Sequence, residues 1–107
     1  MMVRKEISED ILRYFAVKKG YSATEIAKAV SAPVSHIDNI LKSKEYFTIK
    51  DVLSYIENSK MMFWEFAIEA LDLSHLPEKT RKRVLVCQQL AELLKKRGCV
   101  IKCKYNH

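Results

Sequence analysis

Glycine and proline are scarce in this chain, which has two of each among 107 residues. An all-β sandwich needs a turn about every ten residues, and such turns are built mainly from these two residue types. Their scarcity therefore argues against an all-β fold and favours long, uninterrupted helices. The length predicts one domain with one modest core that needs no disulfide or metal to stabilise it.

The sequence also lacks a long apolar run. Its most apolar stretch, from Met61 to Leu73, contains Glu65, Glu69 and Asp72, so no membrane span is expected. The N-terminal residues become acidic where a signal peptide would become apolar. The three cysteines lack the spacing of a disulfide framework and are typical of reduced thiols. We therefore expect a cytoplasmic protein.

Positive charge predominates and is unevenly distributed. Residues 1–50 carry nine basic and six acidic side chains, residues 51–78 carry one and six, and residues 79–107 carry nine and one. Such blocks indicate a basic surface for an acidic partner, with nucleic acid the expected one. The basic C-terminal third has alternatives: it could dock on the acidic block of the same fold or of a second copy, bind another protein, or form a solvated face.

Helix-start and helix-stop signals predict a mostly α domain of five or six helices. The expected helices span about residues 9–19, 23–30, a segment opening near Pro33 or Val34, 49–57, 60–73 and 78–97. The predicted N-caps are Ser8, Ser22 with Glu25, Thr48 with Asp51, and Asn58 or Ser59. The first helix is expected to bury Leu12, Phe15 and Ala16.

The C-terminal half has the pattern of an association surface. The segment 60–73 is apolar almost all round, so it is either central to its own core or part of a subunit interface. The last helix carries a wide apolar stripe of Val84, Cys87, Ala91 and Leu94, with Leu85, Leu90 and Leu93 alongside. Residues 99–105 then alternate with the two-residue period of a strand.

A single strand has no partner in this chain, so we hypothesise that it pairs with its own copy across a two-fold axis in a homodimer. The residues expected at the dimer interface are Phe63, Trp64, Ile68, Leu90, Leu94, Ile101 and Cys103. Residues 1–107 would thus form one domain, with a helix-turn-helix portion at 1–58 and dimerisation helices and a terminal strand at 59–107.

Two short helices separated by a tight turn are typical of the helix-turn-helix, which places its second helix in the DNA major groove. The segment from Ser22 to Lys44, SATEIAKAVSAPVSHIDNILKSK, resembles the phage-repressor-like (Xre) helix-turn-helix family. Ile26 and Ala27 stand for the Leu-Ala pair of its pattern, Ile37 for the buried isoleucine of the recognition helix, Ile40 for the next inward position, and Lys44 for the terminal basic residue.

The segment departs from the family pattern at four positions. Ser31 and Ser43 occupy the two glycine positions, Pro33 replaces a capping serine, and Leu41 replaces a glutamate. A left-handed backbone at Ser31 would cost about 1 kcal/mol or more, because serine has a Cβ.

The resemblance implies a set of DNA-binding residues: Ser22, Ala23, Val34, Ser35, His36, Asp38, Asn39, Lys42 and Lys44. Asn39 suits an adenine edge and Val34 a thymine methyl, whereas Asp38 either accepts from a cytosine amine or repels phosphate. This helix carries no arginine, so a bidentate guanine contact from it is not expected.

Other kinds of site have weaker sequence support. Cys99, Cys103 and His107, with Cys87, could be read as metal ligands, but their spacing is not that of a zinc ribbon, and no metal or other cofactor is expected. The scattered histidines, and the lack of a glycine-rich phosphate loop, indicate a protein that is not an enzyme. Trp64 lacks the basic neighbours of a base-stacking platform.

The sequence thus predicts a homodimeric, sequence-specific regulator of transcription, acting as a repressor on double-stranded DNA. The alternative is a protein-interaction adaptor, antitoxin-like or anti-activator, that uses a helix-turn-helix fold without reading bases. Arg81, Lys82 and Arg83 open the last helix as a basic block that could contact DNA or protein.

Overall fold

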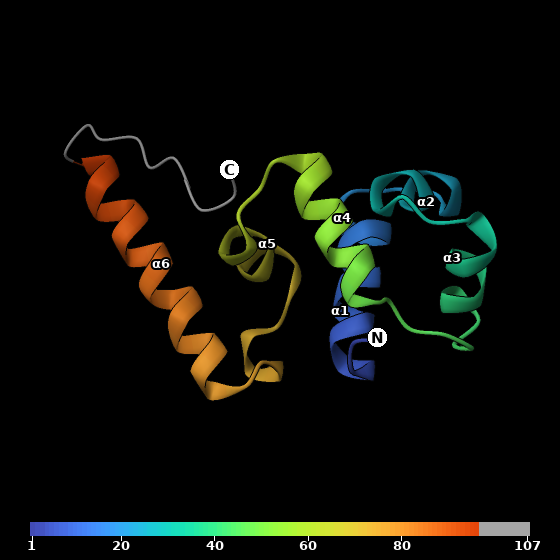
Figure 1. Cartoon of the computed structure of the whole chain (residues 1–107), viewed down its shortest axis with the longest axis horizontal. Coiled ribbons are helices and arrows are strands. Elements are labelled where there is room, and N and C mark those ends of the chain that lie inside the picture. Colours follow the sequence, from blue (N-terminus) through green and yellow to red (C-terminus); the bar gives the residue numbers. More distant parts are fainter. Residues whose placement is uncertain (97–107) are drawn as a thin grey trace.

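The computed structural model describes residues 1–96 and places them in a mostly helical fold (Figure 1). Its elements are α1 (Lys5–Arg13), the π-helical turn η1 (Tyr14–Lys18), α2 (Ala23–Val30), α3 (Val34–Leu41), α4 (Ile49–Ser59), α5 (Phe63–Ala70), the 3₁₀ turn η2 (Leu73–His75) and α6 (Glu78–Lys96). The mostly α class is confirmed, with six α-helices in this range. The predicted strand at 99–105 lies outside the described residues.

The first helix begins earlier than predicted, and Ser8 is not its N-cap. The helix starts at Lys5, so Ser8 lies inside it and is buried. The Ser8 hydroxyl accepts a hydrogen bond from the backbone N–H of Phe47 at 3.0 Å. A short polar side chain that was expected to cap its own helix therefore ties α1 to the segment before α4.

At the C-terminal end of this helix, the hydrogen bonding changes from the α-helical to the π-helical pattern. In η1 the N–H of Lys19 bonds to the carbonyl of Tyr14 at 2.9 Å, one residue further back than in an α-helix. The wider turn lets the neighbours Tyr14 and Phe15 both enter the core, while Ala16, which was expected to be buried, is exposed.

The second, third and fourth helices begin where the sequence predicts. In the capping box of α2, Ser22 Oγ accepts from the Glu25 N–H at 3.3 Å and the Glu25 carboxylate accepts from the Ser22 N–H at 2.9 Å. Thr48 and Asp51 form the matching box of α4, with bonds of 2.8 and 3.1 Å. Each box satisfies two backbone N–H groups that would otherwise lack partners.

The fifth helix is shorter than predicted. The fourth helix, α4, continues to Ser59 and ends at a left-handed Lys60. Asn58 and Ser59 therefore belong to α4, and the prediction that one of them caps the fifth helix is wrong. The helix starts instead at Phe63, and the Glu65 carboxylate accepts from the N–H of Met62 at 2.9 Å. Asn58 donates to the carbonyl of Ala29 and to Ser31 Oγ, so it fastens the end of α4 to the turn after α2.

An aromatic cluster holds these helices together. Phe15 and Tyr55 meet edge to face with ring centroids 4.9 Å apart, and Phe66 lies 5.7 Å from both Tyr14 and Tyr55. The hydroxyls of Tyr14 and Tyr55 are 2.8 Å apart and share a hydrogen bond. Burial raises the pKa of Tyr14, so its hydroxyl stays neutral. The cluster joins α1, η1, α4 and α5 in one core, which Phe47 extends.

A buried carboxylate ties α1 to the connection before α6. Asp10, in the middle of α1, is only 3% exposed. Its Oδ2 accepts from the N–H of Asp72 at 3.0 Å and from His75 Nδ1 at 2.8 Å. The hydrogen bond to Asp10 raises the pKa of His75 above its usual value. Arg4, directly before α1, also donates to the carbonyl of His75. Arg4 and Asp10 thus both hold the connection between α5 and α6.

The last helix, α6, packs against α5 and lies at one end of the long axis of the molecule (Figure 1). At 1.5 Å per residue, α5 is about 12 Å long and α6 about 28 Å, so α5 covers only part of it. Of the apolar positions predicted for its stripe, Val84 is buried and Ala91 and Leu94 are half-buried, whereas Leu85, Cys87, Leu90 and Leu93 are exposed. No helix among residues 1–96 is long and apolar enough to cross a membrane.

Candidate nucleic-acid interface

The α2–turn–α3 unit contains a left-handed serine in its turn, and a second one follows α3. A turn of three residues separates the helices, and Ser31 within it adopts the left-handed conformation, with φ 57° and ψ 47°. Ser43, after α3, is also left-handed, with φ 61°. These are the two positions where the family pattern has glycine, the residue for which this backbone costs least.

The side chains of α3 divide into an inner and an outer face. Ile37 and Ile40 are buried against the core, with 0% and 4% exposure. The residues implied as DNA contacts fall into two groups: Ser22, Val34, Ser35, Asp38, Lys42 and Lys44 are exposed, and Ala23, His36 and Asn39 are half-buried. The outer face of α3 is not covered by α6, because the two helices lie at opposite ends of the molecule (Figure 1).

Two of these residues bond to carboxylates of their own chain. His36 Nδ1 lies 2.7 Å from Glu45 Oε1, and its Nε2 lies 2.7 Å from Asp51 Oδ2. Asn39 donates through Nδ2 to the second oxygen of Glu45 at 2.6 Å. We call these four residues the His36 clamp. It joins α3, the α3–α4 connection and the first turn of α4.

The clamp favours a protonated His36. Carboxylate oxygens only accept, so both ring nitrogens must carry hydrogen for both bonds to form. Burial lowers the pKa of His36, but the hydrogen bonds to Asp51 and Glu45 outweigh it and raise that pKa above its usual value. The bonds from Asn39 and then His36 lower the pKa of Glu45.

The clamp changes which side chains are free to meet a base. The amide nitrogen of Asn39, which a two-point contact with adenine requires, is already bonded to Glu45. Both ring nitrogens of His36 are likewise engaged. The exposed residues of α3 are Val34, Ser35, Asp38 and, at its C-terminal end, Leu41.

Sequence reasoning missed Glu45 as a partner of α3 and assigned Asp51 to the cap of α4 alone. Asp51 does both: its Oδ2 accepts from the N–H of Thr48 as well as facing His36. The short connection between α3 and α4 was the available signal, since it keeps the start of α4 near α3.

Basic side chains flank α3. Lys42 and Lys44 follow it directly and are exposed, as are Lys28 on α2 and Lys50 in the first turn of α4. Asp38 is exposed on α3 itself. Phosphate contacts are therefore expected from the lysines that follow α3 rather than from its whole outer face.

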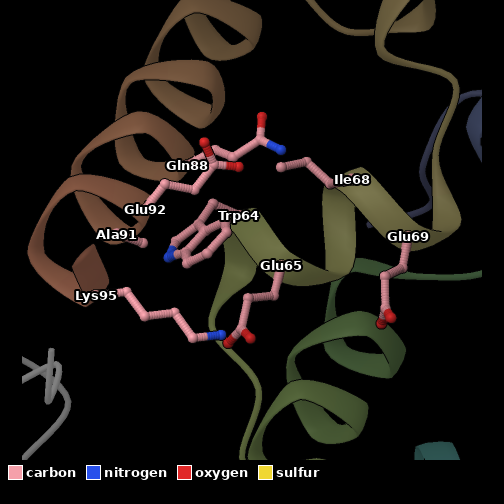
Figure 2. A pocket seen from close by; sticks show the side chains of 8 residues that line it. All are labelled: Trp64, Glu65, Ile68, Glu69, Gln88, Ala91, Glu92 and Lys95. Atoms are coloured by element: carbon pink, nitrogen blue, oxygen red, sulfur yellow. The ribbon is translucent and has the colours of Figure 1, made fainter. Parts of the chain in front are cut away.

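A hollow lies between α5 and α6 (Figure 2). It is a cleft of about 260 Å³ with apolar walls from Trp64, Ile68 and Ala91 and with Glu65 and Lys95 extending toward each other at its edge. Trp64 and Ile68, which the sequence assigns to a dimer interface, thus face α6 of their own chain.

The other residues assigned to the dimer interface are distributed differently. Phe63 and Leu90 are exposed and Leu94 is half-buried, while Ile101 and Cys103 lie outside the described residues. In the basic block, Arg81 is half-buried, and Lys82 and Arg83 are exposed. Lys82 forms an ion pair of 3.0 Å with Glu78.

Within residues 1–96, no group of three His, Cys, Asp or Glu side chains could hold a metal ion. Cys87 is exposed on α6, and Cys99, Cys103 and His107 lie outside this range. No protein-family model, curated protein or solved structure matches the chain.

Proposed function

We propose that this protein is a sequence-specific, double-stranded DNA-binding regulator of transcription that acts as a homodimeric repressor. The observation that carries the proposal is the α2–turn–α3 unit, with left-handed serines at both glycine positions of the helix-turn-helix pattern and an uncovered outer face on α3. In this arrangement α3 enters the major groove, and α2 crosses the DNA backbone beside that groove.

In this proposal, base contacts come from the exposed side chains of α3. Ser35 can donate or accept, Val34 can contact a thymine methyl, and Asp38 can accept from a cytosine amine. Asp38 would be repelled by a phosphate, so its best position is inside the groove over a cytosine. His36 and Asn39 act as positioning residues, because both bond to Glu45 and His36 also bonds to Asp51 in the first turn of α4.

Affinity would come mainly from phosphate contacts by Lys42 and Lys44, which are exposed directly after α3. In the dimer, two copies of α3 would lie one duplex turn apart on a pseudo-palindromic site. The dimer contact belongs to the 59–107 portion, where the exposed Phe63 is a candidate.

Retention on random duplex DNA at increasing salt tests this proposal. A sequence-specific regulator keeps a subset of duplexes at salt concentrations that release the rest. Glu57→Gln, an exposed change on α4, is a suitable control variant because it should leave retention unchanged.

The second candidate function is a protein-interaction adaptor, favoured by the bonds that engage His36 and Asn39 within the chain. In the retention experiment an adaptor would bind all duplexes weakly, and salt would erase that binding equally for every sequence.

A further inference from the structure

The outer side of α6 carries a second apolar face. Val86 is 51% exposed, Leu90 52% and Leu93 49%, and Leu85 beside them is 38% exposed. The spacing i, i+4, i+7 places Val86, Leu90 and Leu93 within an arc of about 60° on the helix surface. Val84, the residue of α6 buried in the core, lies on the opposite side of that helix. We call Val86, Leu90 and Leu93 the α6 stripe.

The helix around the stripe is strongly basic. Residues 78–96 contain six Lys or Arg and two Glu. Lys79, Lys82 and Arg83 are exposed in the first two turns, and one of the two acids, Glu78, is already paired with Lys82 at 3.0 Å. An occupant of the stripe therefore meets unpaired positive charge at the N-terminal end of α6.

This charge disfavours a parallel second copy of α6 as the occupant. Parallel pairing would bring the basic first turns of two copies together, with Lys79, Lys82 and Arg83 of each copy side by side. Like charges meet in that arrangement, and each such juxtaposition destabilises the pairing.

The spacing of the apolar side chains also favours a protein helix as the occupant over two other acidic surfaces, duplex DNA and a membrane. Duplex DNA would satisfy the basic residues but would leave four aliphatic side chains exposed to water. Helices that lie in a membrane surface generally present Trp, Phe and Leu to the lipid. This face has no aromatic residue. Anchors at i, i+4 and i+7 are the pattern by which one amphipathic helix binds another.

We propose that the α6 stripe binds an acidic amphipathic helix of a partner protein. The apolar side chains of the partner pack on Val86, Leu90 and Leu93, and its carboxylates meet Lys79, Lys82 and Arg83. The inference does not depend on DNA binding, since α6 and α3 lie at opposite ends of the molecule (Figure 1).

Binding of designed peptides to the full chain tests the proposal. The probe is a fluorescently labelled helical peptide of about 20 residues with leucine at heptad a and d positions and glutamate at e and g. The comparison peptide has lysine in place of every glutamate. We expect the acidic peptide to bind at least ten times more tightly than the basic one, measured by fluorescence anisotropy at low ionic strength.

The double variant Val86→Ser/Leu90→Ser should weaken acidic-peptide binding by about tenfold or more. Both positions are about half exposed, so the fold should be retained, which circular dichroism checks. Leu53→Ser is the matched control, because Leu53 is 58% exposed on α4, and it should bind like the unchanged protein. Lys82→Glu/Arg83→Glu should reverse the preference toward the basic peptide.

Three outcomes would overturn the proposal. The first is equal binding of the acidic and basic peptides, or equal weakening by Leu53→Ser and by the stripe variant. The second is self-association that disappears in the stripe variant, measured by sedimentation, which would assign the stripe to a second copy. The third is binding to phosphatidylserine vesicles without binding to the acidic peptide, which would assign it to a membrane surface.

Discussion

Replacing His36 with alanine tests the clamp that fixes α3 to α4. The change removes the hydrogen bond to Asp51, whose side chain is only 7% exposed. Hydrogen bonds to charged groups contribute about 1.5–3 kcal/mol. Because Asp51 keeps its bond from the N–H of Thr48, it is not left without a donor, and we expect a loss of about 2 kcal/mol near pH 6. The bond to Glu45, whose side chain is 39% exposed, should add little.

The size of this loss should depend on pH. The pKa of His36 is raised in the folded protein, so folding favours its protonated form. The resulting stabilisation is complete below the unfolded pKa of about 6.5 and is lost as pH rises through the folded pKa. The difference in unfolding free energy between the unchanged protein and His36→Ala should therefore be larger at pH 6 than at pH 9.

Urea unfolding at pH 6 and pH 9 measures this difference. His75 also has a raised pKa, so the pH dependence of the unchanged protein alone does not isolate His36. His75→Ala is the matched control. Its unfolding free energy should lose the part of the pH dependence that comes from His75 and keep the part that comes from His36. A loss in His36→Ala that is the same at both pH values would refute the clamp as a charged interaction.

Three further predictions concern the turn, the phosphate contacts and the core. Ser43→Gly, in the turn after α3, should stabilise the protein by about 0.5–1 kcal/mol, seen as a higher Tm, because glycine adopts the left-handed conformation of this residue at lower cost; a lower Tm would contradict this. Lys42→Ala/Lys44→Ala should reduce the slope of log affinity for DNA against log salt by about 2, whereas Lys79→Ala on α6 should not alter it, and equal effects would count against phosphate contacts beside α3. Phe66→Ala should cost about 3–5 kcal/mol of unfolding free energy in urea titrations, because Phe66 is 1% exposed among aromatic rings; a cost below about 1 kcal/mol would show that it is not central.

Sequence patterns predicted the helix starts that depend on a few adjacent residues. The capping boxes at Ser22 and Thr48 are complete within four residues, so nothing distant is needed to identify them. Ser8 and Asn58 have the same local chemistry, but their hydrogen bonds go to Phe47 and Ala29, which are far away in the sequence. Local patterns cannot show which short polar side chain will have a tertiary partner.

The candidate site was predictable only in outline. Helical periodicity predicts an inward face of Val34, Ile37, Ile40 and Leu41; Ile37 and Ile40 are buried, but Val34 and Leu41, at the two ends of α3, are 40% and 48% exposed. The bonds from His36 to Glu45 and Asp51 depend on how the α3–α4 connection folds back, which no spacing rule specifies. For α6, periodicity identified apolar residues, but the short length of α5 decides which of them are covered.

The most direct test of the proposed function is the effect of Ser35→Ala and Asp38→Ala on DNA sequence preference. Duplexes selected from a random pool by the unchanged protein would be re-measured with each variant at fixed salt. The account predicts an enriched pseudo-palindromic site, and a loss of about 1–3 kcal/mol of discrimination at one base pair per half-site for each variant. Selection without any enriched sequence, or variants that keep the full preference of the unchanged protein, would contradict the placement of the outer face of α3 in the groove.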